Sequence, residues 1–208
     1  MSFPPRYAIL LDGAFVIKKL KLSLNKFPDA DDVVDLCNGI KNKPELSNLE
    51  LLRIYFYHAP PSNDVLTNPI DGAALNLANT QVYRENKSLI DKLELKPDFA
   101  LRLGEISVNR EWIVRERSLK DILSRSRQIQ ASDIKPDINQ KGVDLRIGLD
   151  IARISLKQLV RVLVVITGDS DLIPAFKFAR REGIRIYLKT MGHGVKRELK
   201  VHTDLILS

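Results

Sequence analysis

Four carboxylates stand where this chain changes from one expected element to the next. Three follow apolar runs that are typical of buried strands, and one lies in the first turn of an expected helix. Carboxylates that cluster repel one another, and a hard divalent cation with oxygen ligands removes that cost. Mg²⁺ or Mn²⁺ held in this way polarises a phosphoryl oxygen and helps to deprotonate an attacking water, which suits phosphodiester hydrolysis. The candidate catalytic and metal-binding residues are Asp12, Asp144, Asp169 and Asp171.

The run 162–166 predicts the strand that organises this set. All five of its residues are apolar and four are β-branched, which is typical of a strand buried on both faces of a parallel sheet. The run 7–11 predicts a second such strand. Ligands bind at the carboxyl edge of open α/β sheets, so Asp12 and Asp169 are expected on the same edge. A helix that enters from a loop on that edge would bring Asp144 there too.

Expected strands and helices alternate along most of the chain, which predicts an α/β fold with a mostly parallel sheet and helices on both faces. Residues 105–140 are the least regular part, and we interpret them as an insertion or excursion within one domain that spans 1–208. A strand at 112–114 and a basic helix at 119–129 are expected inside this excursion. The other expected strands are 50–57, 99–103, 185–188 and 205–207, and the expected helices are 15–24, 29–40, 80–95, one opening at 141–144, one from 172 to 183 and one at 195–201.

The chain is basic, with a net charge of +7 and a pI of about 9.5, so a polyanionic partner such as RNA is expected. Residues 177–200 hold eight basic residues against two acidic ones and directly follow the acidic stretch. A basic surface would hold an RNA backbone without reading its sequence. The candidate substrate-binding residues are Lys141, Thr167, Ser170, Lys177, Arg180 and Arg181.

Several functional classes fit the sequence poorly. The single Cys37 excludes an intramolecular disulfide and is expected to be a buried structural thiol. The chain start lacks a signal-peptide pattern and no apolar run reaches membrane-spanning length, so we expect a cytoplasmic protein without a membrane partner. Ser170 has no partnered histidine for hydrolase chemistry, and dinucleotide and Walker A patterns do not occur, so no organic cofactor is expected. The three histidines, His58, His193 and His202, show no metal-ligand spacing.

Each aspartate also has an ordinary structural interpretation. Asp144 could favour the dipole at a helix N-terminus, Asp171 could cap the helix that follows it, and Asp12 could belong to a simple turn. Asp150 is expected to form ion pairs on a solvated helix surface with Arg146 or Arg153. Taken together, several aspartates at one predicted edge of the sheet favour a functional site over these separate structural roles.

Three segments resemble the NYN domain, in the LabA-like branch of the PIN-domain-like nuclease superfamily. They are Leu11-Asp-Gly13, Lys141-Gly-Val-Asp144 and Thr167-Gly-Asp-Ser-Asp171. The resemblance implies a PIN-like three-layer α/β/α sandwich and a ribonuclease that depends on Mg²⁺ or Mn²⁺. It also implies that Asp12, Asp144 and Asp169 are metal ligands, directly or through water, and that Asp171 completes the pocket. Many members have Asn where this chain has Ala14-Phe15, a departure that puts full activity in question.

The leading hypothesis is therefore a ribonuclease that uses a metal-activated water on single-stranded or structured RNA. The alternative is a non-catalytic regulatory module that keeps the fold and binds RNA or protein. A phosphatase or nucleotidase is a third hypothesis, since a carboxylate–Mg²⁺ site also suits small phosphate esters. A homodimer contact through an edge strand or through 105–140 is a further expectation.

Overall fold

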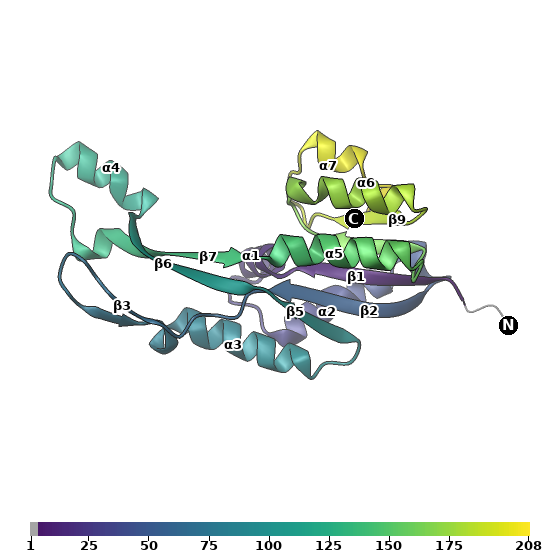
Figure 1. Cartoon of the computed structure of the whole chain (residues 1–208), viewed down its shortest axis with the longest axis horizontal. Coiled ribbons are helices and arrows are strands. Elements are labelled where there is room, and N and C mark those ends of the chain that lie inside the picture. The colour runs from purple at the N-terminus through teal and green to yellow at the C-terminus, as the bar shows by residue number, and fades with distance from the viewer. Residues whose placement is uncertain (1–3) are drawn as a thin grey trace.

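The computed structural model describes residues 4–208, apart from the side chain of Arg110. Its core element is a six-stranded parallel sheet in the order β10-β9-β8-β1-β2-β5 (Figure 1). The sheet strands are β1 (Arg6–Asp12), β2 (Glu50–His58), β5 (Phe99–Leu103), β8 (Val162–Ile166), β9 (Arg185–Lys189) and β10 (Leu205–Ile206). Every strand predicted for this sheet is present.

The order of the strands reverses at β1. The chain proceeds from β1 through β2 to β5 on one side, and it then returns to build β8, β9 and β10 on the other side. Leu11 of β1 is in register with Ile166 of β8, while Asp12 is in register with Tyr57 of β2. The carboxyl ends of three strands therefore meet at a topological switch point, which is where open α/β sheets bind ligands.

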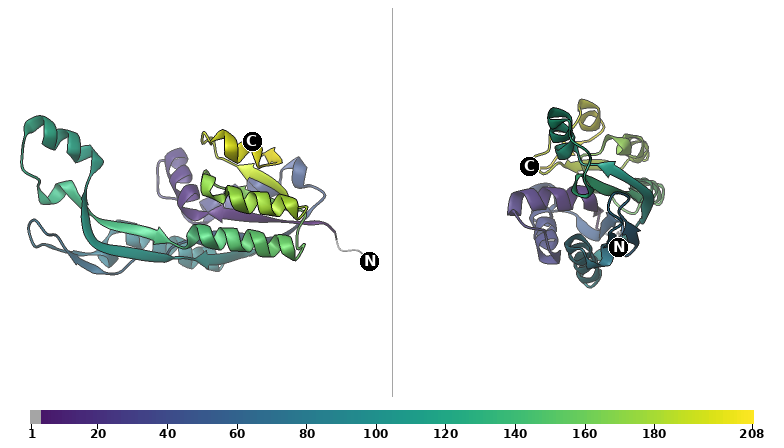
Figure 2. Two further views of the ribbon diagram at one scale, coloured as in Figure 1. Left: turned by 45° about the horizontal axis from the view of Figure 1, so that its top comes forward. Right: turned by 90° about the vertical axis from the view of Figure 1, so that its left-hand side faces the viewer.

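Helices cover both faces of the sheet, as a three-layer sandwich requires (Figures 1 and 2). Side chains of α1, α2 and α3 pack with those of the sheet in one hydrophobic cluster, and side chains of α5, α6 and α7 pack in the other. The helices are α1 (Gly13–Leu24), α2 (Ala30–Lys41), α3 (Gln81–Glu94), α4 (Glu116–Arg125), α5 (Val143–Leu156), α6 (Ile173–Arg181) and α7 (Arg197–Val201), with 3-10 turns η1 (Pro44–Leu46), η2 (Leu77–Asn79), η3 (Ala131–Asp133) and η4 (Ser170–Leu172).

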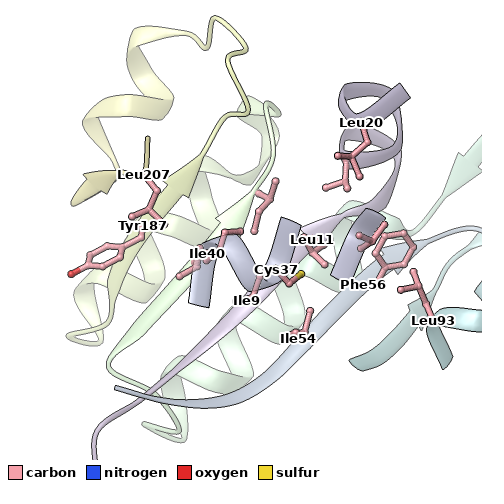
Figure 3. Packing of buried hydrophobic residues seen from close by; sticks show 14 of the residues in the cluster. Ile9, Leu11, Leu20, Cys37, Ile40, Ile54, Phe56, Leu93, Tyr187 and Leu207 are labelled. Carbon is pink, nitrogen blue, oxygen red and sulfur yellow. The ribbon is translucent and has the colours of Figure 1, made fainter. Parts of the chain in front are cut away.

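The alternation of side chains along β1 explains why one strand serves both clusters. Ile9 and Leu11 point into the cluster beneath α1 and α2, whereas Ala8 and Leu10 belong to the cluster beneath α5 and α6. All four are fully buried. Figure 3 shows the first cluster, in which Cys37 lies among these apolar side chains. Burial raises the pKa of the Cys37 thiol to about 12, so it is the structural residue that the sequence predicted.

The predicted excursion is an antiparallel ribbon that extends away from the sandwich and carries α4 at its far end (Figures 1 and 2). Its strands are β6 (Glu105–Val114) and β7 (Ile134–Lys141). The strand predicted at 112–114 is only the end of β6, and the helix predicted at 119–129 stops at Arg125. The sequence did not predict β7, nor the small hairpin of β3 (Val65–Thr67) and β4 (Ala74–Asn76).

Every residue of α4 is at least partly exposed, so the helix contributes nothing to either core cluster. Within residues 4–208, no helix has the length and apolar character needed to cross a membrane.

Candidate functional site

The hydroxyl of Thr167 joins the two strands that flank the switch point. Thr167 follows β8, is fully buried, and donates from Oγ1 to Oδ2 of Asp12 at the end of β1 (3.0 Å). The same oxygen accepts a hydrogen bond from the backbone N–H of Asp169 (3.0 Å). The second oxygen of Asp12, Oδ1, accepts from the N–H of Phe15 (3.2 Å), which makes Asp12 the N-cap of α1. The hydroxyl of Thr167 thus binds the carboxylate of Asp12 and the backbone of Asp169 at the same time.

Asp169 caps the turn that leads into α6. Its Oδ1 accepts from the N–H of Asp171 (2.9 Å), at the start of η4. Asp171 does not cap α6, as the sequence had suggested it could. The N-cap of α6 is Leu172, which makes no side-chain capping bond, and Asp169 caps the 3-10 turn that precedes the helix. Asp171 is exposed within that turn.

Asp144 lies on the first turn of α5, a helix that packs against α6 and against the η4 turn that follows Asp169. The helix is preceded by Gly142, whose φ of 72° is a left-handed conformation that favours glycine. Arg146 Nη1 donates a hydrogen bond to the carbonyl of Gly142 (2.9 Å) and so stabilises the turn that leads into α5. The Asp144 side chain is exposed, as a carboxylate that meets a substrate must be.

The four carboxylates affect one another electrostatically. Burial raises the pKa of Asp12, the hydrogen bonds from Phe15 and Thr167 oppose that rise, and the charges of Asp144 and Asp169 add to it. Asp144 is exposed but partly desolvated by the surrounding protein, which raises its pKa, and the charges of Asp169 and Asp171 raise it further. The fold therefore brings the four predicted carboxylates into one electrostatically coupled group.

No group of three or more His, Cys, Asp or Glu side chains within residues 4–208 is arranged as a metal-ligand set. The chemistry of the donors nevertheless fits a hard cation, since all four groups offer carboxylate oxygens and repel one another. Mg²⁺ commonly uses one or two carboxylates and keeps several waters, so a preformed cage of three ligands is not required. Asp12 and Asp169, held next to each other by Thr167, are the best candidates for direct ligands.

Two glycines, Gly13 and Gly168, allow neighbouring groups to pack closely around the site. A Cβ on Gly13 would lie 2.5 Å from the carbonyl oxygen of Tyr57, so only glycine lets α1 start against β2. A Cβ on Gly168 would lie 2.7 Å from ring atoms of both Phe15 and His193. Neither ring was predicted as part of the site, although a glycine directly before Asp169 is a sign that other atoms approach the backbone closely.

The predicted substrate-binding residues separate into two groups. Thr167 lies within the acidic site. Ser170 lies in the adjoining turn, where its Oγ is 3.5 Å from Nζ of Lys196, and Lys141 precedes Gly142 at the end of β7. Lys177, Arg180 and Arg181 follow the first turn of α6, and the two arginines sit at its last turn, away from the carboxylates.

Arg180 has a structural partner at that far end of α6. Its Nε donates to Asp204 (3.2 Å), whose other oxygen accepts from the N–H of Ile186 and so anchors β9. The structure therefore does not bring Arg180 and Arg181 to the acidic site.

The prediction for Asp150 was wrong. Its carboxylate accepts hydrogen bonds from the hydroxyl of Tyr57 (3.0 Å) and from Nε of Arg102 (2.9 Å), rather than pairing with Arg146 or Arg153. The pKa of Tyr57 lies well above its usual range because the ring is buried beside this carboxylate. Helical spacing alone could not reveal partners that come from β2 and β5.

His58 lines a mainly apolar pocket of about 430 Å³ between α3 and the β6–β7 ribbon. Its Nε2 lies 2.9 Å from Oδ1 of Asn86, and burial lowers its pKa. This pair fastens the end of β2 to α3, so His58 has a structural role.

The NYN domain family model matches residues 70–206 of the chain, which is more than half of its length. The chain belongs to the NYN domain family. The matched part of this NYN protein contains Asp144, Asp169 and Asp171. Asp12 precedes it and reaches the other carboxylates through the pairing of β1 with β8 and the hydrogen bond from Thr167. The architecture is that of the PIN-like nuclease fold.

A solved structure supports the fold of this NYN protein independently. A protein of unknown function from Vibrio parahaemolyticus shares it with a TM-score of 0.53 and 15% sequence identity, over 100% of this chain and 95% of that one. At this identity the likeness shows the fold alone. A search of curated proteins gave no match.

Proposed function

We propose that this NYN protein is a metal-dependent ribonuclease that hydrolyses phosphodiester bonds at the carboxyl edge of its sheet. The observation that supports this most strongly is the coupled carboxylate group at the β1–β8 switch point, where Thr167 holds Asp12 and Asp169 together. The negative charges of Asp144 and Asp169 help to raise the pKa of Asp12, and those of Asp169 and Asp171 help to raise the pKa of Asp144, so placing these carboxylates near one another costs free energy. A bound divalent cation would remove this cost.

The roles follow from burial and position. Asp12 and Asp169 would hold Mg²⁺ or Mn²⁺, with Asp171 completing the shell through water. Once bound, the ion would polarise the scissile phosphate and lower the pKa of an attacking water. We assign Asp144 the task of orienting that water and accepting its proton, because its exposed carboxyl has a raised pKa. Thr167 keeps Asp12 and Asp169 in place throughout.

The basic residues nearest this edge are candidates to hold the RNA backbone. Lys196 approaches the turn that carries Asp169, and Lys141 precedes the helix that carries Asp144. Such contacts neutralise phosphates without reading bases and weaken as the salt concentration rises. Arg180 and Arg181 could contact only RNA that extends beyond the site.

Cleavage of an end-labelled, unstructured RNA tests the proposal. The wild type is expected to cut it with Mg²⁺ or Mn²⁺ and to stop when EDTA is added, whereas Asp169→Asn should lose at least about a hundredfold in rate, as removal of a key electrostatic group does. Asp35→Asn, the same substitution at an exposed position of α2, should cut like the wild type.

Equal cleavage by the wild type and Asp169→Asn would contradict the proposal. RNA binding without cleavage by either protein would favour the non-catalytic module instead.

A further inference from the structure

Two aromatic rings lie against the turn that holds Asp169. The ring centroids of Phe15, on the first turn of α1, and His193, in the loop after β9, are 5.7 Å apart in an edge-to-face arrangement. Both rings reach the space that a Cβ on Gly168 would occupy. They therefore contact the backbone next to the proposed catalytic carboxylates, and we call this pair the aromatic rim.

Positive charge accompanies the aromatic rim. Nζ of Lys19 lies 5.8 Å from the centroid of the Phe15 ring, and Nζ of Lys196 lies 3.5 Å from Oγ of Ser170. Surfaces that bind single-stranded nucleic acids combine these two features, since cations follow the backbone while aromatic rings stack on bases.

Packing accounts for only part of the aromatic rim. Phe15 is half-buried and packs with one side against the core cluster, which explains an apolar residue there. His193 is exposed on a turn between Gly192 and Gly194. Stability of the core does not require an exposed ring at this position, directly beside the acidic turn.

We propose that the aromatic rim stacks a nucleobase of the RNA substrate next to the phosphate that would bind at the proposed metal site. This inference rests on the proposed function and narrows its substrate to single-stranded RNA. A base inside a duplex is already stacked between its neighbours and would have to leave the helix to reach the rim.

Binding measured in EDTA separates this inference from catalysis. Fluorescence anisotropy of a labelled single-stranded RNA gives the affinity of the wild type, His193→Ala and Phe15→Leu, and the same series is repeated with an RNA that lacks its bases. Stacking contributes about 1–3 kcal/mol per base, so each substitution should weaken binding of the intact RNA by about 5- to 150-fold. The abasic RNA should bind all three proteins equally.

Three further variants and substrates sharpen the test. His193→Phe keeps a ring and should restore binding, while His202→Ala, the same kind of change at the end of α7, should bind like the wild type. A duplex RNA should bind the wild type and His193→Ala alike. Phe15→Leu should retain a cooperative thermal transition, because leucine still fills the apolar side of the position.

Unchanged affinity of His193→Ala and Phe15→Leu would overturn the inference, as would an equal loss for intact and abasic RNA. Carboxylate-dependent cleavage combined with either result would leave the proposed ribonuclease standing without the stacking role. A protein that neither binds nor cleaves RNA would refute both.

Discussion

At the scale of single residues, Thr167 connects the parts of the proposed site. Its hydroxyl donates to Asp12 and accepts from the N–H of Asp169, so it uses both of its capacities inside a fully buried environment. A buried polar network is stable only while each member has its partner. The energetics of the site should therefore depend on this one oxygen.

Thr167→Val should destabilise the protein by about 1–3 kcal/mol, because an isosteric methyl leaves an Asp12 oxygen and the Asp169 N–H without partners. Thr167→Ser keeps the hydroxyl and should cost less than about 1.5 kcal/mol. Urea unfolding at neutral pH measures both. A valine variant as stable as the serine variant would show that the hydroxyl does not hold the site together.

The raised pKa of Asp12 predicts a dependence of stability on pH. A carboxyl with a higher pKa in the folded chain binds its proton more tightly there, so its contribution is fully present below the ordinary value of 3.8 and is lost as the pH rises through the folded pKa. The pKa of Asp144 is also raised, so its contribution to stability changes with pH in the same direction. In EDTA, Asp12→Asn should therefore gain stability relative to the wild type as the pH rises from about 4 to 7.

The Tm of Asp12→Asn relative to that of the wild type should therefore rise steadily across this pH range, which thermal unfolding at several pH values measures. The difference between the two proteins is the relevant quantity, because Asp31, Asp32 and Asp133 have lowered pKa values and change the stability of both in the opposite direction. A difference that shrinks with rising pH would contradict the account.

At the scale of elements, the start of α1 shows how closely the site is built on the sheet. Asp12 ends β1 and caps α1, and Gly13 follows at a point where the backbone of β2 leaves no room for a side chain. The change from strand to helix at Asp12 and Gly13 thus places the Asp12 carboxylate against Thr167, the residue that follows β8. The local capping of α1 by Asp12 and the long-range pairing of β1 with its neighbours therefore favour the same position of this carboxylate.

Gly13→Ala should destabilise the protein by about 1–3 kcal/mol, since its Cβ would overlap the carbonyl of Tyr57 and force α1 away from β2. Gly39→Ala is the matched control, because Gly39 is exposed inside α2 with open space around it. There alanine should stabilise the helix by about 0.5–1 kcal/mol. Thermal unfolding of both variants tests the pair, and a neutral Gly13→Ala would argue against the close approach.

The elements that the sequence predicted correctly are those with strong local patterns. The buried runs at β1 and β8 and the apolar stripe of α5 determine the sheet order near the site and the arrival of Asp144. The pairing of β7 with β6 was missed because β7 is mostly polar and mostly exposed, so it lacks the alternation of apolar and polar residues that marks a half-buried strand. Partners that lie far apart in sequence, such as His193 with Phe15 and Asp150 with Arg102, have no local signature.

At the scale of the whole molecule, the chain combines a tightly packed sandwich with an arm, the β6–β7 ribbon and α4 (Figure 1). The arm is held to the β3–β4 hairpin by a hydrogen bond from Asn68 to the carbonyl of Ala131. Its exposed apolar side chains include Leu119 and Leu123. We propose that it is an excursion from one domain rather than a part of the folding core.

Replacing residues 115–133 by Asn-Gly tests this proposal. Val114 and Ile134 are directly opposite each other in the ribbon, so a two-residue turn can join them. The shortened protein should unfold within about 2–4 °C of the wild type, because no core contact is removed. Loss of cooperative unfolding would show that the arm belongs to the core.

Binding of Mn²⁺ tests most directly the claim that this carboxylate group is a metal centre. Isothermal titration calorimetry of the metal-free wild type should show saturable binding, and Asp12→Asn and Asp169→Asn should each weaken it by about tenfold or more, while Asp35→Asn should leave it unchanged. Wild type that binds no Mn²⁺, or binds it as tightly after Asp12 and Asp169 are changed, would contradict the account.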